Sequence, residues 1–178
     1  MSFLIRLAES RDYGATERIE AVADALLIDR FAAQDWPGAT SAAEREAAPG
    51  FVLVAENQDT AEAVGFVQVL EIDDHAHLEQ LSVLPSFSRQ GLGRRLVQTA
   101  LDESTKRGYE EVTLRTYADV PWNAPFYASC GFIETDPDTH FLRSLVDVER
   151  ALGLFDHGPR VQMTARLGDW QHSSLARP

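Results

Sequence analysis

A short glycine-containing segment carries the clearest chemical signal, and it reads Gln90-Gly91-Leu92-Gly93-Arg94-Arg95. It lies between a predicted strand and a predicted helix. Glycine lets the backbone approach a ligand closely, and the N-terminus of a helix directs its N–H groups toward an anion. Arginines in the first turn oppose the helix dipole unless a bound anion offsets their charge. The segment matches neither the Walker loop nor the dinucleotide fingerprint. We interpret it as a phosphate-binding turn or as an ordinary tight connection.

Two titratable side chains lie on the strand before this turn. His77 and Glu79 share one face with Leu81 and Val83, because side chains alternate along a strand. If that face borders a ligand, Glu79 or His77 can take a proton from an amine, directly or through water. The alternative is a polar pair that faces solvent. A metal site is a further alternative, although we expect no metal, since acidic loop residues commonly precede a strand. Its ligands would be Asp73, Asp74, His75 and His77.

A third group of chemical interest lies between Val120 and Phe132. Tyr127 falls in a short helix predicted over 124–130, with Asn123 as its N-cap. The phenol of Tyr127 can donate a proton to a leaving thiolate, and the alternative is a packing residue. Cys130 has no recognisable histidine partner in the sequence, so we expect a buried structural thiol there.

Hydrophobic periodicity predicts the elements that position these residues. Strands are expected at 3–7, 51–55, 63–72, 76–84, 112–117, 132–135 and 160–167. Helices are expected at 12–30, within 32–50, from 92 to near Gly108, at 124–130 and at 141–152. The first helix starts from Asp12 as N-cap and is expected to bury one stripe: Ile19, Val22, Leu26 and Leu27. The helix after the glycine turn is expected to bury another: Leu92, Leu96, Ala100 and Leu101. Strands 76–84 and 112–117 flank this helix, which predicts a parallel pair.

Composition and charge restrict the partners. The 178 residues carry a formal net charge of −12, which argues against nonspecific binding to nucleic acid or to an anionic membrane. Residues 86–107 nevertheless hold five basic and two acidic side chains, so this segment is +3 and the remainder is −15. Positive charge in such a background indicates a specific anionic ligand. A lone cysteine and the lack of a recognisable signal peptide predict a cytoplasmic protein.

The length predicts a single domain over residues 1–178, with a core at about 3–167 and a frayed tail at 168–178. Three segments, taken in order, resemble the GNAT superfamily of N-acetyltransferases. They are Leu81-Ser82-Val83-Leu84-Pro85, Gly91-Leu92-Gly93, and Asn123 with Tyr127 and Gly131-Phe132. The resemblance implies an α/β (α+β) fold: a mixed, mostly antiparallel sheet of about seven strands, flanked by helices. One parallel strand pair would splay apart to form the acetyl-CoA cleft.

The same resemblance implies an N-acetyltransferase that moves an acetyl group from acetyl-CoA, its cosubstrate, directly to a primary amine of a small molecule or peptide. The alternative is a noncatalytic acyl-CoA-binding sensor of the same fold. Tyr127 would be the general acid and Glu79 the base. The implied cofactor-binding residues are Leu81, Ser82, Val83, Arg89, Gln90, Gly91, Leu92, Gly93, Arg94, Arg95 and Asn123.

The chain departs from the family pattern at two places. Ser88 stands where the family has Gln or Arg, three residues before the first glycine. Residues 136–159 add a helix that would cover the sheet or contact a second copy of the chain in a homodimer. We expect the acceptor site to involve residues 32–50, lined by aromatic side chains and attractive to a cationic amine. The aromatic candidates are Trp36 and Trp122, and the acidic ones are Glu71, Asp73 and Asp74.

Overall fold

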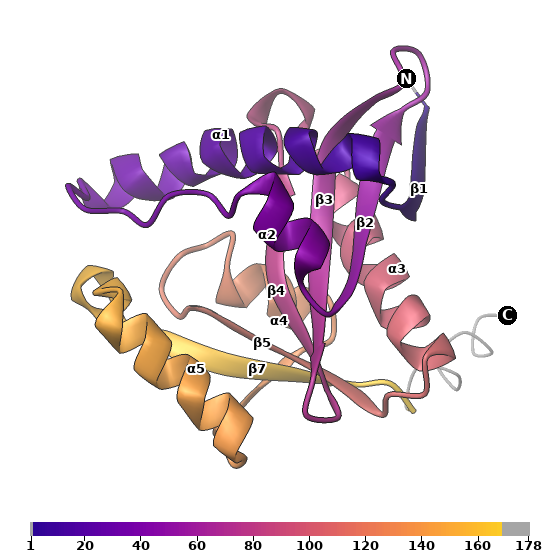
Figure 1. Ribbon diagram of the computed structural model, residues 1–178. Helices are drawn as coiled ribbons and strands as arrows, with labels where there is room; N and C mark the ends of the chain where they lie inside the picture. The colour runs from indigo at the N-terminus through magenta and orange to yellow at the C-terminus, as the bar shows by residue number, and fades with distance from the viewer. Residues whose placement is uncertain (1, 169–178) are drawn as a thin grey trace, which may run out of the picture. The chain divides into compact units, whose positions relative to one another are not determined.

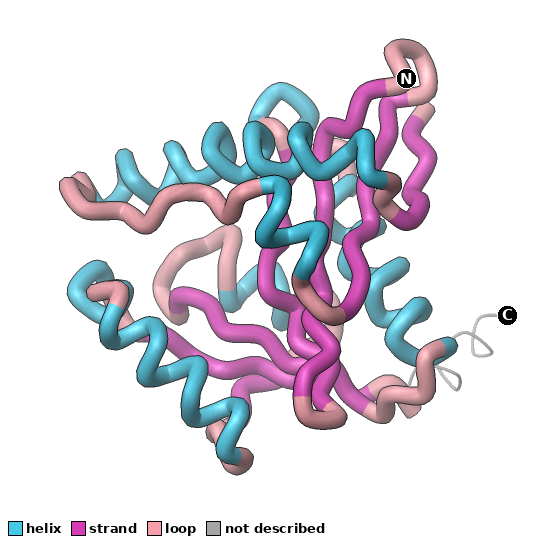
Figure 2. Tube along the Cα trace, viewed as in Figure 1, coloured by secondary structure: helices cyan, strands magenta, loops and turns pink. Residues whose placement is uncertain are grey.

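The computed structural model describes residues 2–168. Seven strands form one sheet in the order β1-β2-β3-β4-β5-β7-β6. Their bounds are β1 Phe3–Leu7, β2 Gly50–Asn57, β3 Glu62–Ile72, β4 His75–Val83, β5 Glu111–Tyr117, β6 Ile133–Thr135 and β7 Arg160–Arg166. The helices are α1 Tyr13–Phe31, α2 Ala42–Ala47, α3 Leu92–Lys106, α4 Ala124–Ser129 and α5 His140–Ala151, with short 3-10 turns at Ser10–Asp12, Pro85–Phe87 and Leu154–His157. Figures 1 and 2 show these elements along the chain. The mixed fold with seven strands is as predicted.

The strand pairing also agrees with the prediction. The pairs β1–β2, β2–β3, β5–β7 and β6–β7 are antiparallel, and β4–β5 is parallel. The parallel register joins Ala76–Leu78 to Val112–Leu114 and so covers three of the nine residues of β4. One parallel pair in a mostly antiparallel sheet is what the resemblance implied.

Two compact units divide the described residues. The first unit comprises residues 2–70 and 79–100, and the second comprises residues 71–78 and 101–168. The chain passes between them within β3, β4 and α3. None of the helices in residues 2–168 is long and apolar enough to cross a membrane. The predicted tail lies outside the described residues, except for Gly168.

The first unit packs α1 and α2 on β2 and β3. Its core cluster is buried: Ile19, Val52, Val54 and Phe66. Arg45 of α2 is inside as well, with 1% of its surface exposed. Its Nε donates to Gln68 at 3.1 Å, its Nη1 donates to Thr16 at 3.0 Å, and its Nη2 bonds Glu20. This buried ion pair joins α2 to α1 and β3.

The apolar stripe predicted for α1 is wrong. Val22 and Leu26 are 48% and 50% exposed, so only Ile19 of the expected stripe is buried. The reason is that α1 buries Thr16 and Glu20 instead, next to Arg45. Asp12 is the N-cap residue of α1, as predicted, although its side chain makes no capping hydrogen bond. Its carboxylate accepts hydrogen bonds from Arg6 and from the Glu9 amide.

The second unit packs α4 and α5 with β5, β6 and β7. Its buried side chains include Leu101, Val112, Leu114, Phe132, Phe141, Leu142 and Met163. The ring of Phe141 in α5 contacts those of His75 and His77 in β4, so the helix that the sequence adds covers part of the sheet within this unit. A homodimer stays a prediction.

Candidate functional site

The predicted phosphate-binding turn lies in the first unit, between β4 and α3. Residues 88–91 are exposed, whereas Leu92 is 1% exposed and anchors the start of α3 in the core. Gly91 has a φ of +76°, a left-handed conformation that favours glycine. Its carbonyl accepts the first helical hydrogen bond, from the Arg95 amide at 3.0 Å. The preceding amides of α3 therefore lie in a first turn, where helix geometry supplies no acceptor and the dipole favours an anion.

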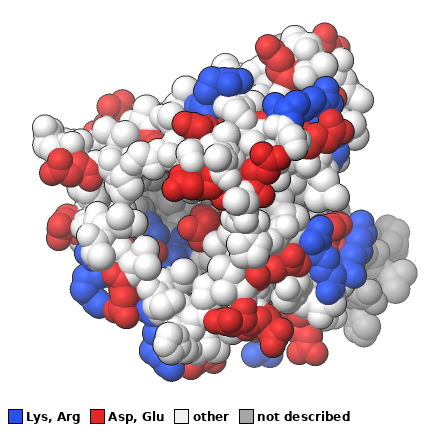
Figure 3. Space-filling model, viewed as in Figure 1, with Lys and Arg blue, Asp and Glu red and all other residues white. Residues whose placement is uncertain are grey.

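Two arginines of the basic segment, residues 86–107, form contacts within the protein. Arg95 Nη2 donates to the Phe3 carbonyl oxygen at 3.0 Å, which ties α3 to β1. Arg107 forms ion pairs with Glu103 at 2.9 Å and with Glu71 at 3.2 Å in the second unit. Figure 3 shows acidic side chains spread over the visible face. Glu103 is already counted in the sum of +3, so of these contacts only the Glu71 carboxylate, outside the segment, offsets part of that charge.

Ser88 has a structural contact of its own. Its Oγ donates to the Pro85 carbonyl oxygen at 2.7 Å, and its amide bonds the same oxygen at 3.1 Å. Both bonds close the 3-10 turn that leads into the glycine segment. The serine that departs from the family pattern thus stabilises the turn itself.

Three of the implied cofactor-binding residues, Leu81 to Val83, complete β4 in the first unit. Ser82 is 4% exposed, and its Oγ accepts from Gln80 Nε2 at 3.0 Å. Gly65 of β3 lies against it: a Cβ there would stand 3.1 Å from the Ser82 carbonyl oxygen and 3.0 Å from Val83 Cγ2. Sequence reasoning missed Gly65. An isolated glycine inside a predicted strand was the available signal, because it marks a close approach of another backbone.

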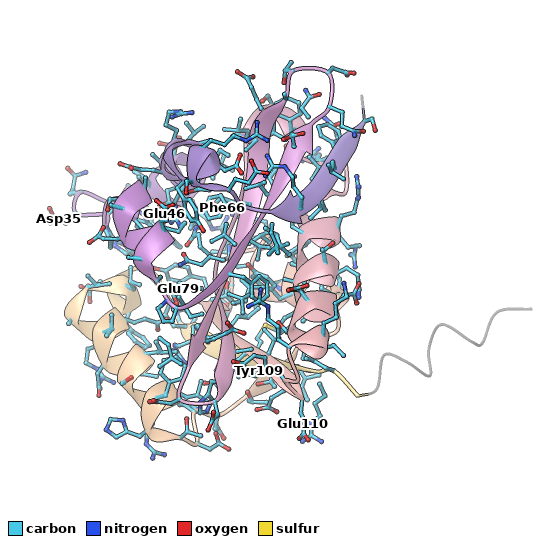
Figure 4. The ribbon with its side chains drawn as sticks, turned by 45° about the vertical axis from the view of Figure 1, so that its right-hand side comes forward. Asp35, Glu46, Phe66, Glu79, Tyr109 and Glu110 are labelled. Atoms are coloured by element: carbon cyan, nitrogen blue, oxygen red, sulfur yellow. The ribbon has the colours of Figure 1, made fainter. Side chains whose placement is uncertain are left out.

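The two candidate bases of β4 differ in their exposure to solvent. Glu79 is exposed (Figure 4). His77 is 3% exposed, and its Nδ1 lies 2.8 Å from Thr113 Oγ1. Burial lowers the pKa of His77 to about 3, with help from the charges of Arg115 and His75. The alternative of a polar pair that faces solvent is therefore wrong for His77, and its imidazole is a poor proton acceptor.

Tyr127 lies on α4 in the second unit. Its half-buried ring makes edge contacts with Phe126 and Phe132, at centroid distances of 5.2 and 5.8 Å. Its hydroxyl makes no hydrogen bond to another residue within 2–168. Burial raises the pKa of Tyr127, the neighbouring Cys130 raises it further, and Arg160 acts in the opposite direction. The phenol therefore stays protonated at neutral pH.

The other residues of this segment have structural contacts. Asn123 is the N-cap residue of α4, as predicted, although its side chain makes no capping hydrogen bond. Its Oδ1 instead accepts a hydrogen bond from Thr116 Oγ1 at 2.6 Å. Cys130 is 5% exposed, as expected of a structural thiol. Gly131 follows the helix with a φ of 95°.

The expected acceptor residues are distributed over both units. In the first, Trp36 stacks on Phe31 at 6.1 Å and donates to Asp24 Oδ2 at 3.1 Å. In the second, Trp122 is 45% exposed. Asp73 and Asp74 both have positive φ, at 49° and 62°, and form the two-residue turn between β3 and β4. No group of three or more potential metal-binding side chains gathers within residues 2–168.

Comparison with known proteins gives one family. The model of the acetyltransferase (GNAT) family matches residues 4–132, more than half of the chain. Over 61 residues, the chain is 39% identical to the ribosomal protein bS18-alanine N-acetyltransferase of Escherichia coli strain K12. This match covers 34% of the chain and 41% of the relative, so it spans about two fifths of that protein's length.

Solved structures share the fold over nearly the whole chain. The ribosomal-protein-S18-alanine N-acetyltransferase from Escherichia coli has a TM-score of 0.62 and 21% identity, covering 93% of this chain and 94% of that one. The PaiA N-acetyltransferase from Thermoplasma acidophilum, solved in complex with coenzyme A, has a TM-score of 0.67 and 17% identity, covering 93% and 99%. At such identities the likeness establishes the fold.

Proposed function

Since the chain belongs to the acetyltransferase (GNAT) family, we propose that it is an N-acetyltransferase that moves the acetyl group of acetyl-CoA directly to a primary amine. One observation carries the proposal: the exposed turn at 88–91 leads into α3 through the left-handed Gly91, with Leu92 buried behind it. That turn lies within the residues matched by the family model. A turn of this form suits a pyrophosphate, because it offers helix-start amides at the protein surface.

The proposed binding roles follow from these contacts. The first-turn amides of α3 would hold the pyrophosphate, and Arg89 and Arg94, both exposed, would add positive charge. Arg95 would position the helix through its bond to Phe3. The backbone near Leu81 would polarise the thioester carbonyl in the manner of an oxyanion donor. Asn123 would contact the cofactor arm with the part of its amide that does not face Thr116.

The chemical step needs two proton transfers. The amine nitrogen forms a bond to the acetyl carbon, the carbon–sulfur bond breaks, and the electron pair leaves on the thiolate. Glu79, directly or through water, would take the proton that the amine loses, since His77 is buried and its pKa is lowered to about 3. Tyr127 would give a proton to the thiolate, because its raised pKa keeps the phenol protonated until the thiolate forms.

The acceptor is proposed to be a small-molecule or peptide amine. The E. coli relative carries the name of a ribosomal protein alanine N-acetyltransferase, which supports a peptide amine as one member of this class. The acidic balance of the chain, −12 overall, favours an amine that approaches as a cation and is deprotonated in the site. We place the reaction in the cytoplasm, as the sequence predicts.

Calorimetry with acetyl-CoA, followed by a thiol-release assay over a panel of amines, tests the proposal. We expect saturable binding of acetyl-CoA and release of coenzyme A with at least one amine. Binding without release for every amine would support the sensor instead. A lack of binding would overturn both functions. Hydrolysis of acetyl-CoA without amine is the blank to subtract.

A further inference from the structure

Two arginines share one carboxylate inside the second unit. Arg115 Nε of β5 lies 2.9 Å from Glu149 Oε2, and Arg160 Nη2 of β7 lies 2.6 Å from Glu149 Oε1. The three side chains are only 6%, 11% and 9% exposed, in the order Arg115, Arg160 and Glu149. Two positive charges therefore face one negative charge in a nearly buried cluster. A buried charge is costly unless an opposite charge compensates it.

Several polar atoms of the cluster lack hydrogen bonds. Nε of Arg115, Nε of Arg160, Oε2 of Glu149 and Oε1 of Gln162 are all buried without a hydrogen-bond partner among the described residues. The contact between Arg115 and Glu149 is thus an ion pair outside hydrogen-bonding geometry. Nε of Arg115 and Oε2 of Glu149 face each other in that ion pair, which leaves Nε of Arg160 and Oε1 of Gln162 without a partner among the described residues. Native proteins satisfy nearly all buried polar groups, so these two atoms call for an explanation, and a bound ligand is one.

The strand register places these side chains on one face of the sheet. Arg115 pairs with Gln162, and Tyr117 pairs with Arg160, across the antiparallel strands β5 and β7. Directly opposed residues point to the same face. The guanidinium of Arg160 lies 4.4 Å above the centre of the Tyr117 ring, so an aromatic face and a carboxylate both hold it. This arrangement fixes the arginines before any ligand arrives.

Two titratable groups that feel the charges of the cluster, His77 and Tyr127, carry no negative charge at neutral pH. His77 stays neutral, and the positive charge of Arg115 helps to keep it so. Arg160 acts to lower the pKa of Tyr127 against the larger effect of burial, and both residues belong to the second unit. An anion at this cluster would therefore lie within electrostatic reach of the reacting group.

We propose that Arg115 and Arg160 bind a carboxylate of the acceptor, so that the acceptor is an amino acid or short peptide with a free carboxylate. This inference rests on the proposed acetyltransferase function. One monoanion balances the excess charge of the cluster, whereas a phosphate dianion would exceed it. Guanidinium groups also match the planar geometry of a carboxylate.

The test compares acceptors that differ only in the carboxylate. L-amino acids and dipeptides are measured against their C-terminal amides with the wild-type protein, by coenzyme A release and by calorimetric binding without acetyl-CoA. We expect kcat/KM for the carboxylates to exceed that of the amides by about tenfold or more, as for a charged hydrogen bond. Arg160→Gln should abolish this preference mainly through KM. Arg150→Gln, a matched change at a 67% exposed arginine of α5, should retain it.

The outcomes separate the two proposals. Equal kcat/KM for carboxylates and amides in the wild-type protein overturns the carboxylate site and leaves the acetyltransferase standing. A lack of amine-dependent coenzyme A release with every acceptor, together with calorimetric binding of carboxylates but not of amides, overturns the acetyltransferase and supports the anion site. Failure of both series to bind and to react overturns the carboxylate site. The wild-type comparison does not depend on the folding of any variant.

Discussion

The buried ion pair between Arg45 and Glu20 makes a sharp prediction about the first unit. The Arg45 side chain is fully buried, and that of Glu20 is 9% exposed. Replacing Arg45 by Met keeps a long apolar stem over Phe66, whose ring centre lies 4.5 Å from the guanidinium carbon. The variant leaves the Glu20 carboxylate buried without its cation. It also removes the donors that Thr16 and Gln68 now accept from.

The expected cost follows from that uncompensated charge. Breaking a buried ion pair by removing one partner costs about 3–5 kcal/mol of unfolding free energy. Burial already raises the pKa of Glu20, and Arg45 opposes the shift, so the variant raises this pKa further. A carboxyl group with a raised folded pKa binds more protons when folded. The loss of unfolding free energy in Arg45→Met should therefore shrink as the pH falls toward about 4.3, the pKa of a glutamate in the unfolded chain.

Urea unfolding followed by far-UV circular dichroism at several pH values measures the effect. The double variant Arg45→Met/Glu20→Gln should recover much of the loss, since no charge is then buried. Arg11→Met is the control in the same unit, because Arg11 and Glu9 are 61% and 60% exposed and an exposed pair contributes about 0–1 kcal/mol. An Arg45→Met loss no larger than that of Arg11→Met, or one independent of pH, would refute the reasoning.

Three further predictions concern the site and its supports. Tyr127→Phe should lower kcat by about 10²–10⁴-fold and leave the Kd for acetyl-CoA unchanged. The control Tyr109→Phe should leave both kcat and this Kd unchanged. An unaltered kcat in Tyr127→Phe removes Tyr127 from the mechanism. Gly65→Ala should cost about 1–3 kcal/mol in urea unfolding, because its Cβ would stand 3.1 Å from a backbone oxygen, while Gly38→Ala, with nothing within 4 Å, should cost far less. The pKa of His77 is about 3 in the folded protein, so between pH 6.5 and that value the unfolded chain binds a proton that the folded chain does not. The free energy of unfolding of the wild type should therefore fall by about 1.4 kcal/mol for each pH unit below 6.5. His77→Gln should flatten that slope, and an unchanged slope would contradict the assignment.

Hydrophobic periodicity predicts correctly where the buried face of an element consists of apolar side chains, as in α3. Leu92, Leu96, Ala100 and Leu101 are all at most 2% exposed, because α3 presents a continuous apolar stripe to the core. The same reasoning failed for α1, where the buried face carries Glu20. The partner of Glu20 is Arg45, 25 residues further along the chain. No local pattern pairs these two residues, since only the folded chain brings them together.

The candidate site was predictable where backbone conformation carries the signal. Gly91 was identified from its place between a strand and a helix, and its positive φ agrees with that reading. The side-chain partners were not predictable. The amide of Asn123 faces Thr116, the hydroxyl of Ser88 faces Pro85, and the ring of His77 faces Thr113. The contacts of His77 and Asn123 depend on which elements pack together, whereas that of Ser88 is local and depends on the conformation of the turn.

Transfer of an isotope-labelled acetyl group is the most direct test of the central claim. The wild-type protein is incubated with acetyl-CoA labelled in the acetyl group and with the panel of amines, and the products are analysed by mass spectrometry. We predict that the label appears on an acceptor nitrogen, with one coenzyme A released for each acetyl group transferred. Saturable binding of acetyl-CoA with no labelled amine in any reaction would contradict the claim.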